Sequence, residues 1–161
     1  MILNMELREI KASSENIDFK LLVAELDFHL TEFYGDEKDF FEKHNKVENI
    51  KNVIIIYDKE NPIGCGGIKE YSNSKMEIKR MYVNPKYRGL GIASNILLSL
   101  ENWAIELGYS TTILETMKVK ESVINMYSKN GYEIIPNYGQ YEKIGKSVCM
   151  SKNVSKKMFE S

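Results

Sequence analysis

The segment Arg88-Gly89-Leu90-Gly91-Ile92-Ala93 combines the residue types that bind a phosphate through the backbone. It lies where a strand-like stretch gives way to a long helix, and the first amides of a helix have no acceptor inside it. The helix dipole adds partial positive charge there, and Gly89 and Gly91 let the backbone approach an anion closely because they lack a Cβ. Arg88 adds a charge that can contact phosphate oxygens. A glycine turn beside a surface arginine gives the same short pattern, so spacing alone leaves that alternative open.

Two other phosphate-binding patterns are excluded by neighbouring residues. A Rossmann fingerprint requires Gly or Ala at Ser94 and an acidic residue after the next strand. A P-loop requires Gly-Lys-Ser or Gly-Lys-Thr, which the sequence lacks. The segment therefore predicts an anion site whose ligand the spacing does not identify.

Apolar periodicity and turn residues predict the elements that would position this segment. We expect strands over residues 5–12, 52–57, 63–71, 75–83, 111–115, 132–135 and 146–150. We expect one helix from a Ser13 or Ser14 cap to about residue 34, and others over residues 37–44, 89–107 and 121–130. The order β-α-α-β-β-β-α-β-α-β-β predicts an α/β (mixed α+β) fold, with a mixed sheet of six to seven strands and about four helices on its faces.

Two of these helices carry a readable apolar stripe. The stripe of the first consists of Ile17, Leu21, Leu22, Leu26, Phe28, Leu30 and Phe33. The stripe of the helix after the glycine segment consists of Ile92, Ala93, Ile96, Leu97, Leu100, Trp103, Ala104 and Leu107, with Gly108 at its C-terminal cap.

Composition limits the classes of partner. The 161 residues fit one domain, expected over residues 1–152 with a polar tail over 153–161. The 22 Lys and Arg against 23 Asp and Glu give a net charge of -1, which provides no electrostatic basis for binding nucleic acid or an anionic membrane. No signal peptide or membrane span is predicted, and Cys65 and Cys149 have no metal-binding or redox spacing. A cytoplasmic protein is expected.

Four segments together resemble the GNAT superfamily of N-acetyltransferases. Arg88 to Ala93 matches the R/Q-x-x-G-x-G/A motif of that family, and residues 77–85 are similar to the strand that precedes it. Leu114-Glu115-Thr116 resembles the next family strand, and residues 126–132 resemble the "LYxxxGF/Y" segment. The resemblance covers roughly residues 63–150 in the family's element order.

The resemblance implies acetyl-coenzyme A as co-substrate, no metal, and a cradle for the pyrophosphate on the amides of Arg88, Gly89, Leu90, Gly91, Ile92, Ala93 and Ser94. The pantetheine arm would bond the backbone around Tyr82, at Met81 and Val83. The strands ending at Val83 and Glu115 would splay apart to admit this arm. Many relatives carry Asn or Gln seven residues before the tyrosine of the "LYxxxGF/Y" segment, whereas this chain has Lys120, which can donate but not accept a hydrogen bond.

Acetyl transfer from a thioester to an amine requires a base and an acid. An amine with a pKa of about 10.4 is mostly protonated at neutral pH, and the departing thiolate needs a proton. Tyr127 is the candidate acid, because it matches the family tyrosine; by its helical stripe alone it reads as a core residue. The resemblance makes Glu77 the candidate base, acting through a water, because it lies six residues before Val83, the spacing at which the histone-acetylating branch of the family carries its base glutamate. Glu77 can also be a surface partner of Lys75 or Lys79. Glu115 is the second choice.

The resemblance places the acceptor site in the first helices and the final hairpin. The residues available there are Asp27, His29, Tyr34, Asp36, Tyr138 and Tyr141. A small-molecule amine is the expected acceptor, with Asp27, Tyr34, Glu115 and Tyr138 as contacts. Protein lysines or N-termini are an alternative acceptor, and a non-catalytic acyl-coenzyme A sensor is an alternative function. Dimers are common in the family, but no segment identifies an interface.

Overall fold

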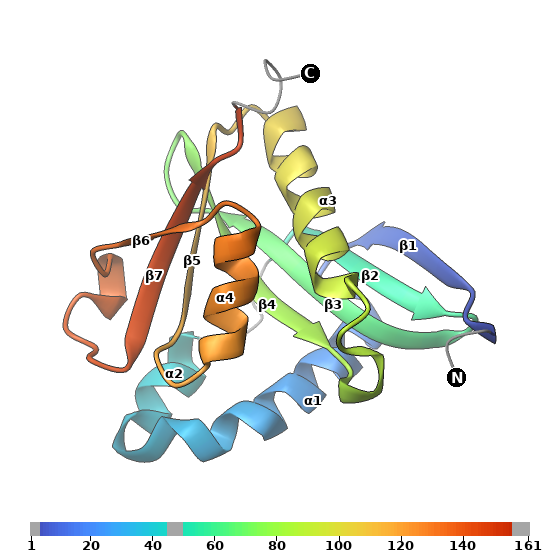
Figure 1. The fold of residues 1–161 in the computed structure, drawn as a ribbon, viewed down its shortest axis with the longest axis horizontal. Helices are drawn as coiled ribbons and strands as arrows, with labels where there is room; N and C mark the ends of the chain where they lie inside the picture. The colour runs from blue at the N-terminus through green and yellow to red at the C-terminus, as the bar shows by residue number, and fades with distance from the viewer. Residues whose placement is uncertain (1–3, 45–49, 156–161) are drawn as a thin grey trace. The chain divides into compact units, whose positions relative to one another are not determined.

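The computed structural model describes residues 4–44 and 50–155. Its strands are β1 (Leu7–Ala12), β2 (Asn52–Asp58), β3 (Asn61–Glu70), β4 (Lys75–Val83), β5 (Thr111–Met117), β6 (Glu133–Ile135) and β7 (Ser147–Asn153) (Figure 1). Its α-helices are α1 (Ile17–Tyr34), α2 (Lys38–His44), α3 (Ile92–Glu106) and α4 (Glu121–Lys129). Short 3-10 turns cover Gly35–Glu37, Pro85–Tyr87 and Gly139–Tyr141. The predicted order of elements and the mixed α/β class are confirmed.

The strands form a seven-stranded sheet in the order β1-β2-β3-β4-β5-β7-β6. The pair β4–β5 is parallel, while β1–β2, β2–β3, β5–β7 and β6–β7 are antiparallel. The chain divides into two compact units, and each is described by itself. The first unit consists of residues up to Ile68 together with Arg80–Leu100, and the second of Lys69–Lys79 together with the residues from Glu101 onward.

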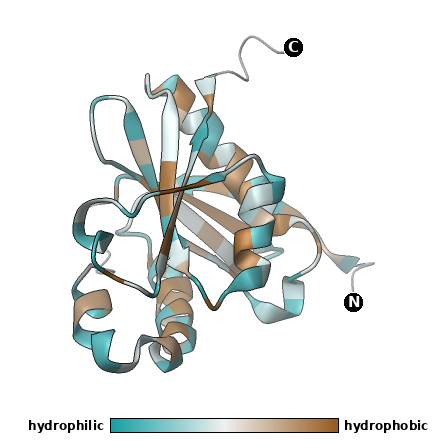
Figure 2. Ribbon diagram, turned by 60° about the vertical axis from the view of Figure 1, so that its left-hand side comes forward, coloured by the Kyte–Doolittle hydropathy of each residue, from teal (hydrophilic) through white to brown (hydrophobic). Residues whose placement is uncertain are grey.

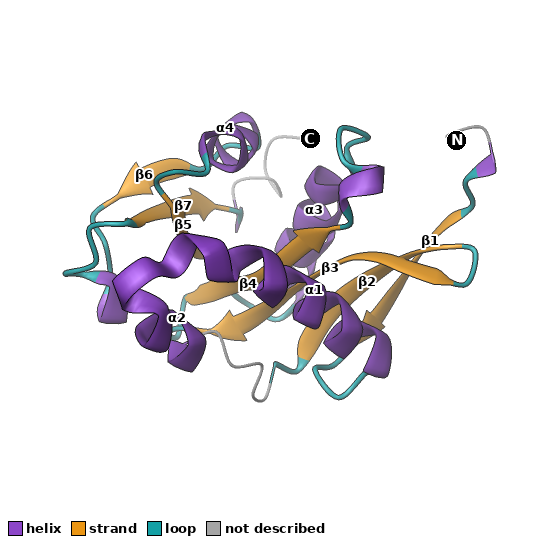
Figure 3. Cartoon of the chain, turned by 90° about the horizontal axis from the view of Figure 1, so that it is seen from below, coloured by secondary structure: helices purple, strands orange, loops and turns teal. Residues whose placement is uncertain are grey.

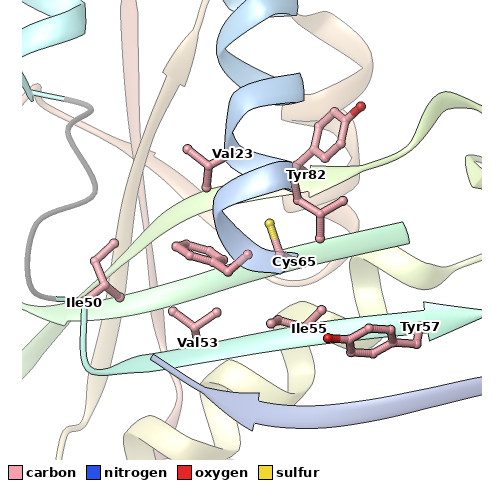
Figure 4. Packing of buried hydrophobic residues seen from close by; sticks show 9 residues of the cluster. Val23, Ile50, Val53, Ile55, Tyr57, Cys65 and Tyr82 are labelled. Carbon is pink, nitrogen blue, oxygen red and sulfur yellow. The ribbon is translucent and has the colours of Figure 1, made fainter. Parts of the chain in front are cut away.

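One core of the first unit lies between α1 and the strands. Phe19, Leu22 and Val23 of α1 pack against residues of β2, β3 and β4 in a single cluster. Figure 4 shows the strand contributions, which include Val53, Ile55, Tyr57, Cys65 and Tyr82. Viewed from below in Figure 3, α1 runs across these strands. Because Cys65 points into this cluster, its neighbours Gly64 and Gly66 face the opposite side of the sheet.

That opposite side receives α3, which the two glycines allow to come close. A Cβ built on Gly64 would lie 3.2 Å from Cδ1 of Ile96, and one on Gly66 would lie 3.1 Å from both Ile96 and Leu100 and would also collide with the sulfur of Met81. Ile96 and Leu100 are fully buried. The close approach fixes the first turns of α3 against β3 and so fixes the glycine segment that precedes the helix.

The start of α1 corrects the predicted cap. Asn16, not Ser13 or Ser14, is the N-cap, and its side-chain oxygen accepts from the amides of Asp18 and Phe19 at 2.8 and 3.1 Å. Ser13 instead accepts from the Glu15 amide in the preceding turn. Asn is as good a cap as Ser, so sequence alone does not rank adjacent candidates.

The predicted stripe of α1 is only partly buried. Ile17, Leu21 and Phe28 are 74%, 56% and 80% exposed, whereas Leu22 is buried together with Phe19 and Val23. In the hydropathy view the helices alternate between brown and teal, whereas the strands carry long brown stretches (Figure 2). Within the described ranges, no helix is both long and apolar enough to cross a membrane.

Some boundaries shift by a few residues. Pro62 lies inside β3, because the turn after β2 closes at Lys59 and Glu60, with Lys59 in a left-handed conformation. The expected polar tail begins inside β7, which extends to Asn153, and Val154 is fully buried with its amide bonded to the Ser110 carbonyl. Residues 156–161 of that tail lie outside the described residues.

Candidate functional site

The cradle belongs to the first unit and has the geometry expected of an anion site. Gly89 and Gly91 have φ of +78° and +79°, the left-handed conformation that favours glycine. A Cβ built on either would meet no atom within 4 Å, so the space before the helix is open. The first helical bond runs from the Asn95 amide to the Gly91 carbonyl, so the Ile92 and Ala93 amides precede the intrahelical ladder. No acidic residue stands in the first turn of α3. These residues fit a phosphate.

Arg88 is anchored at one edge of its guanidinium. Its Nε donates to the Val83 carbonyl at 2.9 Å, and the guanidinium carbon lies 5.9 Å from the centre of the Tyr82 ring. The side chain is exposed, and the remaining N–H groups of a guanidinium stay available for phosphate oxygens. The Val83 carbonyl, predicted as a pantetheine contact, already accepts this bond but has a second lone pair.

The strand before the cradle is irregular at Arg80. This residue has φ of +59°, which interrupts the regular alternation of β4 that would otherwise relate the facing of Glu77 to that of Met81. The Sδ of Met81 lies near Gly66, Ile96 and Leu100, whereas Tyr82 belongs to the cluster under α1. The parallel β4–β5 ladder pairs Lys75 with Thr111, Met76 with Thr112 and Glu77 with Ile113. The parting of these strands for a pantetheine arm stays a prediction.

Glu77 lies in the second unit and is largely enclosed. The residue is 8% exposed, and its Oε2 accepts a hydrogen bond from the phenol of Tyr138 at 2.5 Å. Its Oε1 lies 3.8 Å from Nζ of Lys79, which is itself mostly buried. Glu77 is therefore not the solvated surface carboxylate that the sequence left as an alternative, although it does pair with Lys79.

Glu115 is the second carboxylate of this region. Its Oε2 accepts from the Ser147 hydroxyl. Burial raises the pKa of Glu115 to about 6, and the charge of Glu77 adds to the rise, while the Ser147 bond and the charge of Lys79 oppose it. A carboxylate that titrates near neutral pH can take a proton from the amine that receives the acetyl group and release it again.

Tyr127 is buried on α4, in the same unit. Burial, with the charge of Glu115 as a second cause, raises the pKa of Tyr127 well above its ordinary value, so this phenol keeps its proton at neutral pH. Its ring meets the ring of Tyr132 edge to face at 5.7 Å. Tyr127 is therefore compatible with both interpretations, as a core residue because its ring is packed, and as the candidate acid because its phenol is protonated.

A buried polar chain holds Tyr132 in place. Its hydroxyl donates to Glu101 at 2.9 Å and lies 2.6 Å from the Thr112 hydroxyl. Nζ of Lys152 bonds the other oxygen of Glu101 at 3.0 Å. Glu101 is only 1% exposed, so this pairing compensates a charge that would otherwise be very unfavourable. The chain supports the ring on which Tyr127 packs.

The acceptor candidates are divided between the units. Tyr138 and Tyr141 join the Glu77 region, and their rings are 5.8 Å apart. In the first unit, Asp27 pairs with the buried guanidinium of Arg80, which balances its charge. Tyr34 is 2% exposed and stacks on Phe41, which is a packing role.

The remaining candidates are His29, Asp36 and Lys120. His29 is exposed and stacks on Tyr82 at 6.2 Å. Asp36 is exposed in the turn Gly35–Glu37. Lys120 occupies the position before the first residue of α4, and its side chain does not cap the helix. Among the described side chains, no group of three or more His, Cys, Asp or Glu could hold a metal ion, and metal independence stays a prediction.

Several residues of the site escaped sequence reasoning. Glu101 had a usable signal, because helical spacing from Leu97 and Ala104 places it on the buried face of α3. For Arg80 the sequence contained no such signal, since glycine is the residue type that indicates a left-handed backbone position. Ser147 faces Glu115 across strands that are far apart in sequence, and no local pattern reports such a pairing.

Sequence comparisons identify the family of the chain. The model of the Acetyltransferase (GNAT) family matches residues 18–132. An uncharacterised N-acetyltransferase of Schizosaccharomyces pombe is 24% identical over 144 residues, covering 84% of this chain and 86% of that protein. An IAA acetyltransferase of Azospirillum brasilense is 28% identical over 133 residues, covering 81% of this chain and 87% of that protein.

Solved structures show the same fold. An acyl-CoA N-acyltransferase structure from Klebsiella pneumoniae superposes with a TM-score of 0.77 at 24% identity, covering 92% of this chain and 97% of that one. The PaiA N-acetyltransferase of Thermoplasma acidophilum, solved in complex with coenzyme A, superposes with a TM-score of 0.65 at 21% identity, covering 92% and 99%. With the family model matching well over half of the sequence, the chain belongs to the GNAT family and is an acetyl-CoA-dependent N-acetyltransferase.

Proposed function

We propose that this enzyme transfers the acetyl group of acetyl-coenzyme A to a primary amine of a small molecule, with Glu77 as the base, through a water, and Tyr127 as the acid. The observation that carries the proposal is that the enclosed Glu77 carboxylate, which accepts from Tyr138 at 2.5 Å, and the buried Tyr127 phenol belong to the same compact unit. Candidates for the base and the acid that are 50 positions apart in the sequence are thus both held in the second unit.

The proton steps follow from the two environments. The Glu77 carboxylate receives a proton from the acceptor ammonium by way of a water, which leaves a neutral amine with a free electron pair. When the amine bonds the acetyl carbon and the C–S bond breaks, the Tyr127 phenol gives its proton to the sulfur. The amide nitrogen then loses its extra proton through water, and this proton restores the Tyr127 phenol. A phenol with a raised pKa is a weak acid. The thiolate that takes its proton forms only as the C–S bond breaks, so the proton stays on the Tyr127 hydroxyl until then.

The donor is assigned to the cradle. The amides from Arg88 to Ser94 and the exposed Arg88 guanidinium would bind the pyrophosphate, and the backbone around Tyr82, at Met81 and Val83, would bind the pantetheine arm. The open space at Gly89 and Gly91 supports this assignment. When bound, acetyl-coenzyme A supplies the activated thioester. Two free, buried thiols, Cys65 and Cys149, support a reducing compartment such as the cytoplasm.

Enclosure of the carboxylates supports a small acceptor over a protein. Glu77 is 8% exposed, and the rings of Tyr138 and Tyr141 lie beside it. A protein lysine in an extended segment favours an open groove, whereas a compact amine can enter between side chains.

The test is a panel of small amines and peptides assayed for acetyl-coenzyme A consumption, with the Tyr127→Phe variant on the best substrate. We expect turnover with a small amine and a fall in kcat of about 10²-fold or more in the variant, with coenzyme binding retained. Unchanged kcat would remove Tyr127 as the acid. Turnover confined to peptides would assign a protein substrate, and tight coenzyme binding without any turnover would make the protein a sensor.

A further inference from the structure

The phenol of Tyr138 makes a contact that its predicted place in an acceptor pocket does not require. Its hydroxyl donates to Oε2 of Glu77 at 2.5 Å, at the short end of the range for an O–H group and a charged oxygen acceptor. Burial and the negative charge of Glu77 raise the pKa of Tyr138 far above its ordinary range, so the phenol keeps the proton that it donates.

The loop that carries Tyr138 is fixed rather than loosely attached. Nδ2 of Asn137 contacts three backbone carbonyls, those of Tyr141, Ile144 and Ser147, at 3.1 to 3.2 Å. These contacts close the loop onto the start of β7. A side chain presented by such a loop has little conformational freedom to lose when it forms a bond.

Aromatic packing orients the ring of Tyr138 from two directions. Tyr71, after β3, meets it at 5.0 Å with an angle of 70°, and Tyr141 meets it at 5.8 Å with an angle of 87°. Gly139 follows Tyr138 with φ of +51°, and a Cβ there would lie 3.2 Å from the Tyr71 hydroxyl. Both neighbouring rings contact Tyr138 edge to face, a favourable arrangement that holds its hydroxyl over Glu77.

The charges around Glu77 come from each element packed against it. Lys79 lies on its own strand, Glu115 on β5, Tyr138 and Tyr141 in the closing loop, and Cys149 on β7. Lys79 is the only one of these groups that carries a positive charge, and it is 3.8 Å from Oε1. The hydrogen bond to Oε2 thus complements Lys79, because each oxygen of Glu77 has one stabilising partner.

We infer that Tyr138 is a positioning residue for the base: it fixes the orientation of the Glu77 carboxylate. The inference rests on the proposed role of Glu77. It assigns Tyr138 to the catalytic machinery of the chain instead of the acceptor pocket. Tyr138 acts there through Glu77, which handles the proton. Tyr138 keeps its own proton throughout.

The variant Tyr138→Phe preserves the ring contacts and removes only the hydroxyl. The matched control is Tyr109→Phe, which removes a phenol bond of 2.6 Å to the exposed carboxylate of Glu70 in the same unit. The ¹³C NMR signal of the Glu77 carboxyl carbon, assigned from Glu77→Gln, measures the hydrogen bond directly and needs no substrate. Separate values of kcat and of KM for the acceptor measure its effect in turnover.

In Tyr138→Phe we expect the carboxyl signal of Glu77 to change position, because the hydrogen bond to Oε2 is lost, and kcat to fall about tenfold with KM for the acceptor unchanged. Tyr109→Phe changes neither. An unchanged Glu77 signal overturns the inference, whatever the activity. A changed signal with an unchanged kcat supports the Tyr138–Glu77 contact and shows instead that Glu77 is not the base.

Discussion

Replacing Glu115 by Gln removes a charge that the folded protein accommodates poorly. The side chain is partly buried on β5, and its pKa is raised from 4.5 to about 6, chiefly by burial. Gln has the same shape, and its carbonyl oxygen can still accept from the Ser147 hydroxyl. The substitution therefore isolates the charge from the packing.

The size of the effect follows from the difference between the two pKa values. A rise from 4.5 to about 6 corresponds to about 2 kcal/mol between the two protonation states. Because the folded protein binds this proton more tightly than the unfolded chain, the group opposes folding as the pH rises. This destabilisation of the folded protein by Glu115 is absent below about pH 4.5, grows as the pH rises to about 6, and is complete above that pH.

Urea unfolding between pH 4 and pH 8 measures this dependence. We expect the free energy of unfolding of Glu115→Gln, relative to the wild type, to increase by about 2 kcal/mol from the acid to the neutral end. Glu142→Gln, which changes an exposed carboxylate, is the control and should alter stability by less than about 0.5 kcal/mol. A difference for Glu115→Gln that stays constant or falls with pH would refute the reasoning.

Two further predictions concern the cradle and the buried ion pair. Gly91→Ala should destabilise the protein by about 1 kcal/mol, because the φ of Gly91 is +79°, and it should weaken coenzyme A binding measured by calorimetry. Gly108 is also left-handed with open space around it, so Gly108→Ala should cause a similar loss of stability without weakening coenzyme A binding. Lys152→Met should lower the free energy of unfolding by about 2–3 kcal/mol in urea, since it removes the positive partner of the buried Glu101 charge. Adding Glu101→Gln should recover at least about 1 kcal/mol, and equal stability of the single and double variants would contradict this.

The order of elements was predictable from sequence because each depends on local signals. The stripe from Ile92 to Leu107 is continuous, and Pro85 and Gly108 mark where elements change. The place of the glycine segment directly before α3 was predictable for the same reason, as Arg88, Gly89 and Gly91 lie within four residues of sequence. The cap of α1 was not, since Ser13, Ser14 and Asn16 are chemically equivalent candidates and only the tertiary position of the helix start selects one.

The contacts of the site were largely beyond local reasoning. Glu77 and Tyr138 are 61 residues apart, and their hydrogen bond depends on a strand, a closing loop and two other rings. The left-handed Arg80 breaks the alternation that a regular strand would carry, and its residue type gives no warning. The stripe on α1 was misleading for another reason, because periodicity shows that a face is apolar but not that another element covers it, as Leu21 and Phe28 show.

Gly64 and Gly66 also bear on how quickly and how selectively the donor is captured. Because they leave no side chain between β3 and α3, the helix cannot slide or tilt without colliding with backbone, and its first amides are held in register before any anion arrives. Arg88, tied to the Val83 carbonyl, is restrained in the same way. A binding site that is ordered in advance loses little entropy when the donor binds and need not wait for a loop to close. We therefore expect diffusion to govern the association rate of the donor, and the number of phosphate contacts to govern its residence time.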